Sequence, residues 1–115
     1  MIHTISIKEN QVFRRLYRQG KTAVNPLLAI YCRKNRLGCN RLGVTVSTKV
    51  GNAVTRNRVR RRIKEAYRIH EGAFSPSYDI VVVSRVRCAQ AEFREIEQAL
   101  LELCGKLQLL GTGEE

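Results

Sequence analysis

The sequence has few acidic residues, and this scarcity limits what the chain can bind. Ten Asp and Glu residues stand against 21 Lys and Arg residues among 115, so the formal net charge is +11 at pH 7. Only one of the acids is an aspartate, Asp79. A positive excess of this size is typical of proteins that bind nucleic acid or a strongly anionic surface.

Long apolar runs are also missing. No stretch approaches the roughly 20 apolar residues that a transmembrane helix needs. The first ten residues, MIHTISIKEN, lack a positively charged region followed by an apolar one, so no signal peptide is predicted. We therefore expect a cytoplasmic protein with no membrane partner. Its length suits a single domain over residues 1–110, followed by a disordered tail over residues 111–115.

Groups of side chains that perform catalysis or hold a metal are not recognisable either. The cysteines show no short paired spacing of the zinc-site type, and both histidines lie far from them in the sequence. No nucleophile stands with a base, and no pair of carboxylates suggests acid–base chemistry. We expect no catalytic residue, no metal and no cofactor bound by the protein alone, and reduced thiols. The cysteines and histidines are Cys32, Cys39, Cys88, Cys104, His3 and His70.

Positive charge is concentrated in residues 49–68, where the only acid is Glu65. Wound as a helix from about residue 51, this segment has an apolar stripe on one side and basic residues around the other. Like charges three and four residues apart repel each other, so an ordinary solvated helix would interleave acids. A polyanion is the predicted partner. The stripe consists of Val59, Ile63, Ala66 and Tyr67.

The start of this helix carries its own signals. Gly51 can adopt a conformation that other residues avoid, and Asn52 can cap the exposed amides of the first turn. Asn57 stands among arginines, where its amide can hydrogen-bond a phosphate, a ribose, a base edge or a hydrated metal ion.

Periodicity predicts the other elements. An amphipathic helix ends before Gly20 at a C′ position, and a hairpin pairs two strands. A β-branched run predicts a strand covered on both faces, and a last amphipathic helix turns its acids outward. The ranges are 8–19 (helix), 27–33 and 41–48 (hairpin), 78–85 (covered strand) and 89–110 (last helix), with room for a short strand near 22–25.

These elements predict an α/β (α+β) sandwich with the order α-β-β-β-α-β-α and a four-stranded sheet. The basic helix lies in a β-α-β crossover between parallel strands. In residues 27–33, Tyr31 and Arg33 share the less apolar face. In residues 41–48, Gly43, Thr45 and Ser47 form a small polar face that an RNA backbone can approach closely.

Two other nucleic-acid-binding classes fit less well. A bZIP basic region would continue into a leucine heptad, but Gly72 and Pro76 follow instead. An RRM would need aromatic residues in its central strands, and residues 41–48 have none. A ribosomal or general structured-RNA-binding protein would carry the same basic helix on a sheet, so that class stays open.

Residues 41–68, RLGVTVSTKVGNAVTRNRVRRRIKEAYR, resemble the signature of the bacterial ribonuclease P protein component. The hallmark of that family is an Arg-Asn-Arg helix, present here as Arg56, Asn57 and Arg58. The resemblance extends upstream to the aromatic helix and downstream to the last helix, so it covers nearly the whole chain.

The resemblance implies the protein subunit of an endoribonuclease that removes the 5′ leader from precursor tRNA. Catalysis would belong to the RNA subunit with Mg²⁺, and the protein would be a monomer in a 1:1 complex that binds no DNA. The crossover would be left-handed. Implied contacts to the RNA subunit are Lys49, Asn52, Arg56, Asn57, Arg58, Arg60, Arg61, Lys64 and Arg68. Implied contacts to the leader are Phe13, Tyr17, Tyr31, Arg33, Thr45 and Ser47.

Overall fold

The computed structural model describes residues 3–111, so the predicted tail lies outside the described residues except for Gly111. Its centre is a five-stranded sheet in the order β1-β4-β5-β3-β2. β4 is parallel to both β1 and β5, and β3 is antiparallel to both β5 and β2. The strands are β1 (Thr4–Ser6), β2 (Lys21–Val24), β3 (Leu28–Lys34), β4 (Asn40–Thr45) and β5 (Tyr78–Ser84).

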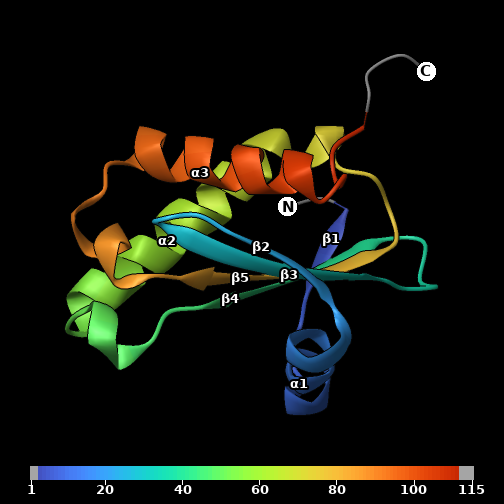
Figure 1. Ribbon diagram of the computed structural model, residues 1–115, viewed down its shortest axis with the longest axis horizontal. Coiled ribbons are helices and arrows are strands. Elements are labelled where there is room, and N and C mark those ends of the chain that lie inside the picture. Colours follow the sequence, from blue (N-terminus) through green and yellow to red (C-terminus); the bar gives the residue numbers. More distant parts are fainter. Residues whose placement is uncertain (1–2, 112–115) are drawn as a thin grey trace.

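Helices cover both faces of the sheet (Figure 1). α2 and α3 lie together on one face, and α1 lies on the other, where its axis crosses the strands. Three short 3₁₀ helices complete the described chain. The α-helices are α1 (Asn10–Gln19), α2 (Ala53–His70) and α3 (Phe93–Lys106), and the 3₁₀ helices are η1 (Thr48–Val50), η2 (Glu71–Ala73) and η3 (Val86–Gln90).

The α+β class is confirmed, but the prediction of a four-stranded sheet in the order α-β-β-β-α-β-α is wrong. An additional first strand, β1, pairs with β4 at the sheet edge, which gives β-α-β-β-β-α-β-α. Three residues are too few to show an alternating pattern, and Ile5 at the centre of β1 is 52% exposed. Tertiary contacts hold this strand: Ile7 N donates to Leu42 O at 2.9 Å, and Thr4 Oγ1 lies 2.8 Å from the Tyr67 hydroxyl.

The predicted parallel pairing across the basic helix is confirmed, because β4 and β5 are parallel neighbours joined through α2. The left-handed sense of this crossover stays a prediction. The strand predicted over 41–48 ends earlier, at Thr45, and η1 follows it. The last helix is likewise shorter than predicted, because residues 86–90 form η3.

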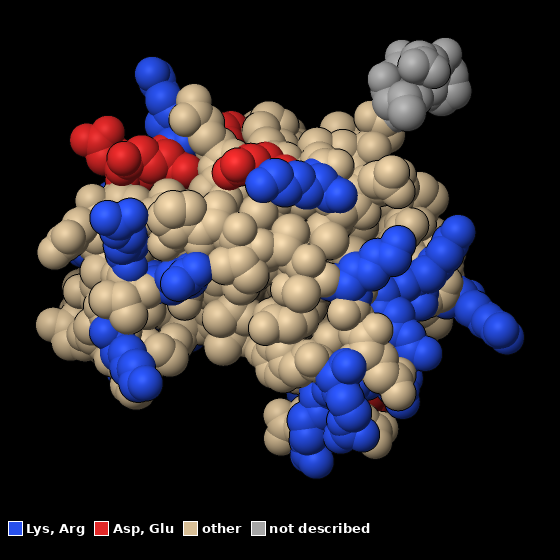
Figure 2. Space-filling model, viewed as in Figure 1, with Lys and Arg blue, Asp and Glu red and all other residues tan. Residues whose placement is uncertain are grey.

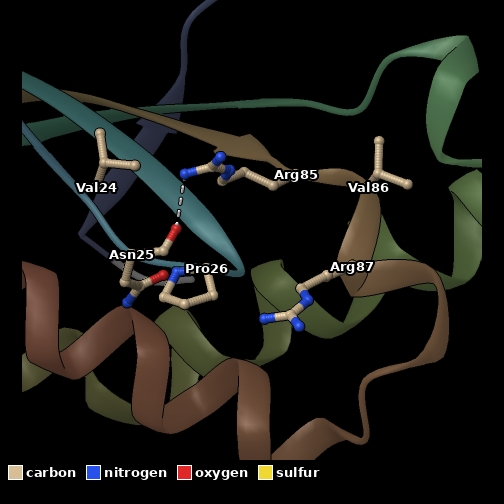
Figure 3. A pocket seen from close by; sticks show the side chains of 6 residues that line it. All are labelled: Val24, Asn25, Pro26, Arg85, Val86 and Arg87. Carbon is tan, nitrogen blue, oxygen red and sulfur yellow. Dashed lines mark hydrogen bonds between the residues drawn. The ribbon is translucent and has the colours of Figure 1, made fainter.

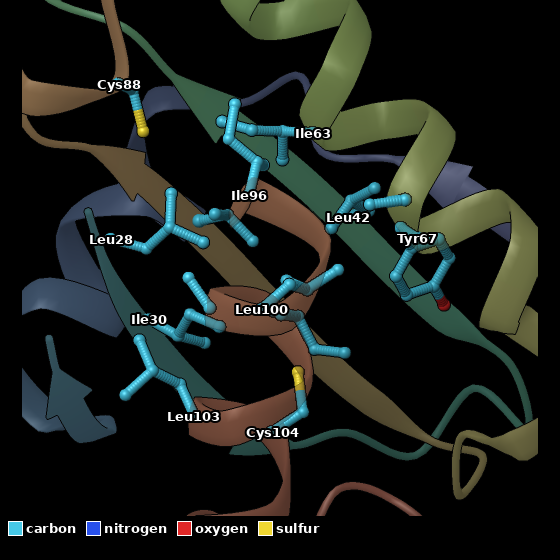
Figure 4. Close-up of a cluster of buried hydrophobic side chains, with 14 of the residues drawn as sticks. Leu28, Ile30, Leu42, Ile63, Tyr67, Cys88, Ile96, Leu100, Leu103 and Cys104 are labelled. Carbon is cyan, nitrogen blue, oxygen red and sulfur yellow. The ribbon is translucent and has the colours of Figure 1, made fainter. Parts of the chain in front are cut away.

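The main core lies between the sheet and the α2–α3 layer (Figure 4). The predicted stripe of α2 is confirmed, with Val59, Ile63, Ala66 and Tyr67 fully buried. α3 adds Ile96, Leu100 and Leu103, and the sheet adds Leu28, Ile30, Leu42, Ile80 and Val82. Burial of this continuous apolar surface is the dominant stabilising contribution.

A smaller cluster lies under α1 and contains Ile7, Val12, Leu16 and Val81. Gly20 follows α1 as predicted, but its φ of −76° is open to any residue. The requirement for glycine is steric, because a Cβ there would lie 2.7 Å from Leu16 O and 2.9 Å from Cys32 O. This glycine lets α1 turn directly into β2 close against β3.

Candidate nucleic-acid interface

The N-terminus of α2 is built as the sequence predicts. Asn52 is the N-cap, and its side-chain oxygen accepts a hydrogen bond from Thr55 N at 2.9 Å. Gly51 has a φ of 157°, and a Cβ there would lie 3.0 Å from the Thr55 side chain. The turn before it is held by Ser47, whose hydroxyl accepts from Lys49 N at 3.3 Å. The cap occupies the Asn52 oxygen and leaves the amide nitrogen available to a ligand.

Three arginines of α2 are bonded to backbone carbonyls. Arg58 donates to Ala89 O at 3.1 Å, and Arg62 donates to Ala91 O at 2.7 Å. Both bonds tie α2 to the segment that begins with η3. Arg56 donates to Gly51 O at 3.1 Å. A guanidinium has five N–H donors, so each arginine can still bind a phosphate while it braces the fold.

The rest of the basic side of α2 is open. Arg61 and Lys64 are exposed, and Asn57 accepts a hydrogen bond from Arg60 at 3.0 Å. Glu65, the only acid, accepts two hydrogen bonds from Arg68 at 2.9 and 2.6 Å. These hydrogen bonds lower the pKa of Glu65. A hollow of about 360 Å³ is lined by Arg60, Arg61, Lys64, Glu65 and Arg68, and its net charge suits an anion.

Three aromatic residues meet on the other face of the sheet, and we call Phe13, Tyr17 and Tyr31 the aromatic cluster. The Tyr17 ring lies 6.5 Å from that of Phe13. It stands edge-on to Tyr31, with centroids 5.0 Å apart. The Tyr17 hydroxyl lies 3.2 Å from Thr45 Oγ1. Four of the six predicted leader contacts therefore lie together.

Phe13 packs closely against the sheet. It is half-buried and sits directly over Gly43 of β4, where a Cβ would lie 2.7 Å from the ring. Tyr17 is 42% exposed. Phe13 thus anchors α1 to the sheet, while Tyr17 presents a ring to solvent, as stacking on an RNA base requires.

The other two predicted leader contacts lie apart from the cluster. Ser47 is exposed beyond the end of β4, at the N-cap of η1. Arg33 lies two residues beyond Tyr31, opposite Asp79 rather than Val81. It lines a different hollow together with Lys21 and Lys34.

Sequence reasoning did not identify Arg85 and Arg87 as site residues. They line a hollow of about 590 Å³ at the end of the sheet, with Val24, Asn25, Pro26 and Val86 (Figure 3). Arg85 donates to Asn25 O at 3.1 Å. By strand alternation it continues the row of Val81 and Val83, both packed in or against the cluster under α1. The sequence therefore held a signal for Arg85: it is the last residue of the β-branched run, and alternation puts it on the sheet face of Val81 and Val83.

The single aspartate has a structural role. Asp79 is 7% exposed and accepts two hydrogen bonds from Arg41 at 2.8 Å and one from Asn35 at 2.9 Å. Burial raises the pKa of Asp79, but the hydrogen bonds from Arg41 and Asn35 outweigh it and hold the pKa below its ordinary value.

The remaining polar groups give no sign of an active site in the part of the chain that is described. His70 pairs with Glu97 at 2.7 Å between α2 and α3. All four cysteines are free thiols, and burial raises the pKa of Cys104 to about 12. Within residues 3–111, no three His, Cys, Asp or Glu side chains are grouped to hold a metal ion. Every helix within residues 3–111 is too short or too polar to span a bilayer.

Comparisons with known proteins identify relatives of one kind. Residues 1–108 match the family model described as Ribonuclease P. A ribonuclease P protein component from Alkaliphilus metalliredigens is 48% identical over 104 residues, which cover 90% of this chain and 94% of the relative. One from Clostridioides difficile is 45% identical over 101 residues, covering 87% and 89%.

Solved structures agree with these relatives. The RNase P protein of Staphylococcus aureus superposes with a TM-score of 0.86 at 30% identity, over 92% of this chain and 97% of that one. The RNase P protein of Thermotoga maritima superposes with a TM-score of 0.77 at 28% identity, over 84% and 92%. These matches do not favour a ribosomal or general RNA-binding protein.

Proposed function

Since this chain belongs to the ribonuclease P protein component family, whose function is tRNA 5′ processing, we propose that it holds two RNAs while the RNA subunit cleaves. The basic side of α2 binds the RNA subunit. The aromatic cluster and the hollow lined by Arg85 and Arg87 bind the 5′ leader of precursor tRNA. The endoribonuclease is then the cytoplasmic holoenzyme, one protein with one RNA.

The observation that carries this proposal is the division of labour between the two faces of the sheet. The open basic groups of α2 have one acid among them, Glu65, which is already paired with Arg68. Exposed arginines and lysines without neutralising acids bind phosphates and release counterions. The opposite face offers Tyr17 and Tyr31 beside the small polar residue Thr45, an arrangement suited to single-stranded RNA.

The side chains of residues 3–111 are not arranged for hydrolysis. The one aspartate is buried against Arg41, and His70 is engaged by Glu97. The described residues offer no cluster for Mg²⁺. We therefore assign both the metal and the bond cleavage to the RNA subunit. The protein would lower the Mg²⁺ requirement, because its cations neutralise crowded phosphates.

Leader binding explains how the holoenzyme would distinguish substrate from product. Only the precursor has nucleotides to occupy the aromatic cluster. Stacking of a base on an aromatic side chain contributes about 1–3 kcal/mol. Mature tRNA lacks this contribution and would be released.

The deciding experiment is cleavage of end-labelled precursor tRNA at low Mg²⁺ by a bacterial ribonuclease P RNA alone, by the protein alone, and by both together. Cleavage at the mature 5′ end only in the mixture supports the proposal. Cleavage by the protein alone would contradict the assignment of catalysis to RNA. No gain over RNA alone, with tight RNA binding retained, would favour a general RNA-binding protein.

A further inference from the structure

A second concentration of positive charge lies away from α2. Blue side chains gather over α1 and the adjoining end of the sheet (Figure 2). We call this the second basic surface. It consists of Arg14, Arg15 and Arg18 on the outer side of α1, and Lys21, Arg33 and Lys34 at the start of β2 and the end of β3, all of them exposed.

Two hollows make this surface continuous. One, of about 220 Å³, lies along α1 and is lined by Arg14, Arg15 and Arg18 with two glutamines. The other, of about 280 Å³, holds Lys21, Arg33 and Lys34. Gln19 lines both. Among residues 3–111, no carboxylate lines either hollow, so a chain of phosphates could follow the surface without meeting a negative charge from these residues.

Within residues 3–111, Arg14, Arg15 and Arg18 of α1 form no salt bridge. Arg14 and Arg18 are four residues apart, and Arg15 and Arg18 are three apart, so they repel one another. Asp79, a buried acid, attracts Arg15 but is already hydrogen-bonded by Arg41 and Asn35. An anionic partner would remove this repulsion.

The second hollow has an apolar floor as well as a basic rim. Cys32 is 2% exposed there, and Tyr78 and Leu107 are half-buried. An unstacked base can rest on such a floor while its phosphate contacts Lys21 or Lys34. A duplex keeps its bases stacked, so this combination favours single-stranded RNA.

The second basic surface starts where the aromatic cluster ends. Tyr17 is the exposed ring of the cluster, Arg18 follows it, and Gln19 connects the two hollows. A single RNA strand that passes from Tyr17 around the C-terminal end of α1 next meets the cations of the second basic surface. α1 lies on the opposite face of the sheet from α2 (Figure 1), whereas the second hollow reaches Leu107 and Gln108 after α3. No residue of α2 lines either hollow, so binding of the RNA subunit to α2 leaves this path open.

We propose that the second basic surface binds the part of the leader that lies 5′ to the nucleotides on the aromatic cluster. The inference rests on the proposed leader-binding function and extends it. It also gives Arg33 a place in leader binding, although Arg33 lies apart from the aromatic cluster. Precursors with long, unstructured leaders should therefore bind more tightly than precursors whose leader fills only the cluster.

The test compares the affinity of the holoenzyme for mature tRNA, a short-leader precursor and the same precursor extended at its 5′ end by uridines. The double variant Arg14→Gln/Lys34→Gln removes one Arg and one Lys from the surface. Arg94→Gln/Lys106→Gln is the matched control on α3, where both side chains are exposed. All four positions lie outside the basic side of α2 and the aromatic cluster.

We expect the extension to tighten binding by the wild type and by the control, and to tighten it less by the Arg14→Gln/Lys34→Gln variant, which keeps four of the six cations. The salt slope for the extended precursor should fall by about 1.4 in that variant, at about 0.7 per phosphate contact with a single strand. An undiminished gain in the variant, or an equal loss in the control, would overturn the inference. If the wild type prefers the short-leader precursor to mature tRNA but gains nothing from the extension, this inference alone fails. If it shows no preference for the short-leader precursor, the leader-binding function itself fails.

Discussion

The two faces of the sheet are covered to very different extents. α2 has 18 residues and α3 has 14, and together they seal one face over a continuous core. α1 has 10 residues, which make a helix of about 15 Å, and it crosses the strands on the other face. Tyr17 and Val24 stay 42% and 49% exposed there. The sealed face provides stability, and the half-covered face keeps surface for a ligand.

A substitution in the sealed face should have the largest effect. Leu100 of α3 is fully buried between the helices and the sheet. Leu100→Ala should reduce the free energy of unfolding by about 2–5 kcal/mol, because it leaves a cavity in a close-packed core. Denaturant unfolding measures this loss. A change below about 0.5 kcal/mol would show that the face is less tightly packed than its burial indicates.

A substitution on the opposite face should reduce the affinity for precursor tRNA rather than the free energy of unfolding. Tyr17→Ala should weaken holoenzyme affinity for precursor tRNA by about 1–3 kcal/mol, because one stacking ring is lost. Tyr17→Phe keeps the ring and removes only the contact between its hydroxyl and Thr45, so it should bind nearly as the wild type does. Affinity for mature tRNA should not change in either variant. An equal loss for precursor and mature tRNA would remove Tyr17 from the leader site.

Two neighbouring arginines of α2 should differ in the same way: Arg62 supports the fold, and Arg61 binds RNA. Arg62→Ala leaves the Ala91 carbonyl without its hydrogen bond and should cost about 1–3 kcal/mol of stability. Arg61→Ala should change stability by less than about 0.5 kcal/mol. It should instead reduce the salt slope of binding to the RNA subunit by about one. Thermal unfolding and salt titrations of both variants test this, and exchanged phenotypes would reverse the two roles.

The smallest expected effect is a pH-dependent contribution of Asp79, on the half-covered face, to the free energy of unfolding. Asp79 shares the sheet face of Val81, and its pKa is held below the ordinary value. A lowered pKa in the folded state contributes stability above the ordinary pKa of about 4, and this contribution is lost as the pH falls through the folded value. The difference in Tm between wild type and Asp79→Asn should therefore narrow below about pH 4. Glu102→Gln, which removes an exposed pair with Lys106, should show no such trend. A difference in Tm that stays constant with pH would contradict the lowered pKa of Asp79.

Much of the architecture follows from local patterns. The stripe of α2, the cap at Asn52 and the buried strand β5 were predicted because each depends on residues within a few positions of one another. β1 was missed because three residues carry no period, and its pairing with β4 is a contact between distant segments. The contacts of Arg58 and Arg62 with the segment from Ala89 to Ala91 were missed for the same reason.

The candidate site shows the same limit. Alternation along β3 correctly placed Tyr31 and Arg33 on one face. It did not show that Tyr31 meets the aromatic cluster while Arg33 lines a separate hollow, since periodicity does not say where a helix crosses a sheet. The basic helix, the aromatic residues and the family resemblance could be found from the sequence, because charge and side-chain type are written in it. Only the tertiary structure decided which cations face a ligand, which brace the fold, and which distant residues share one hollow, because these depend on how segments far apart in the chain pack together.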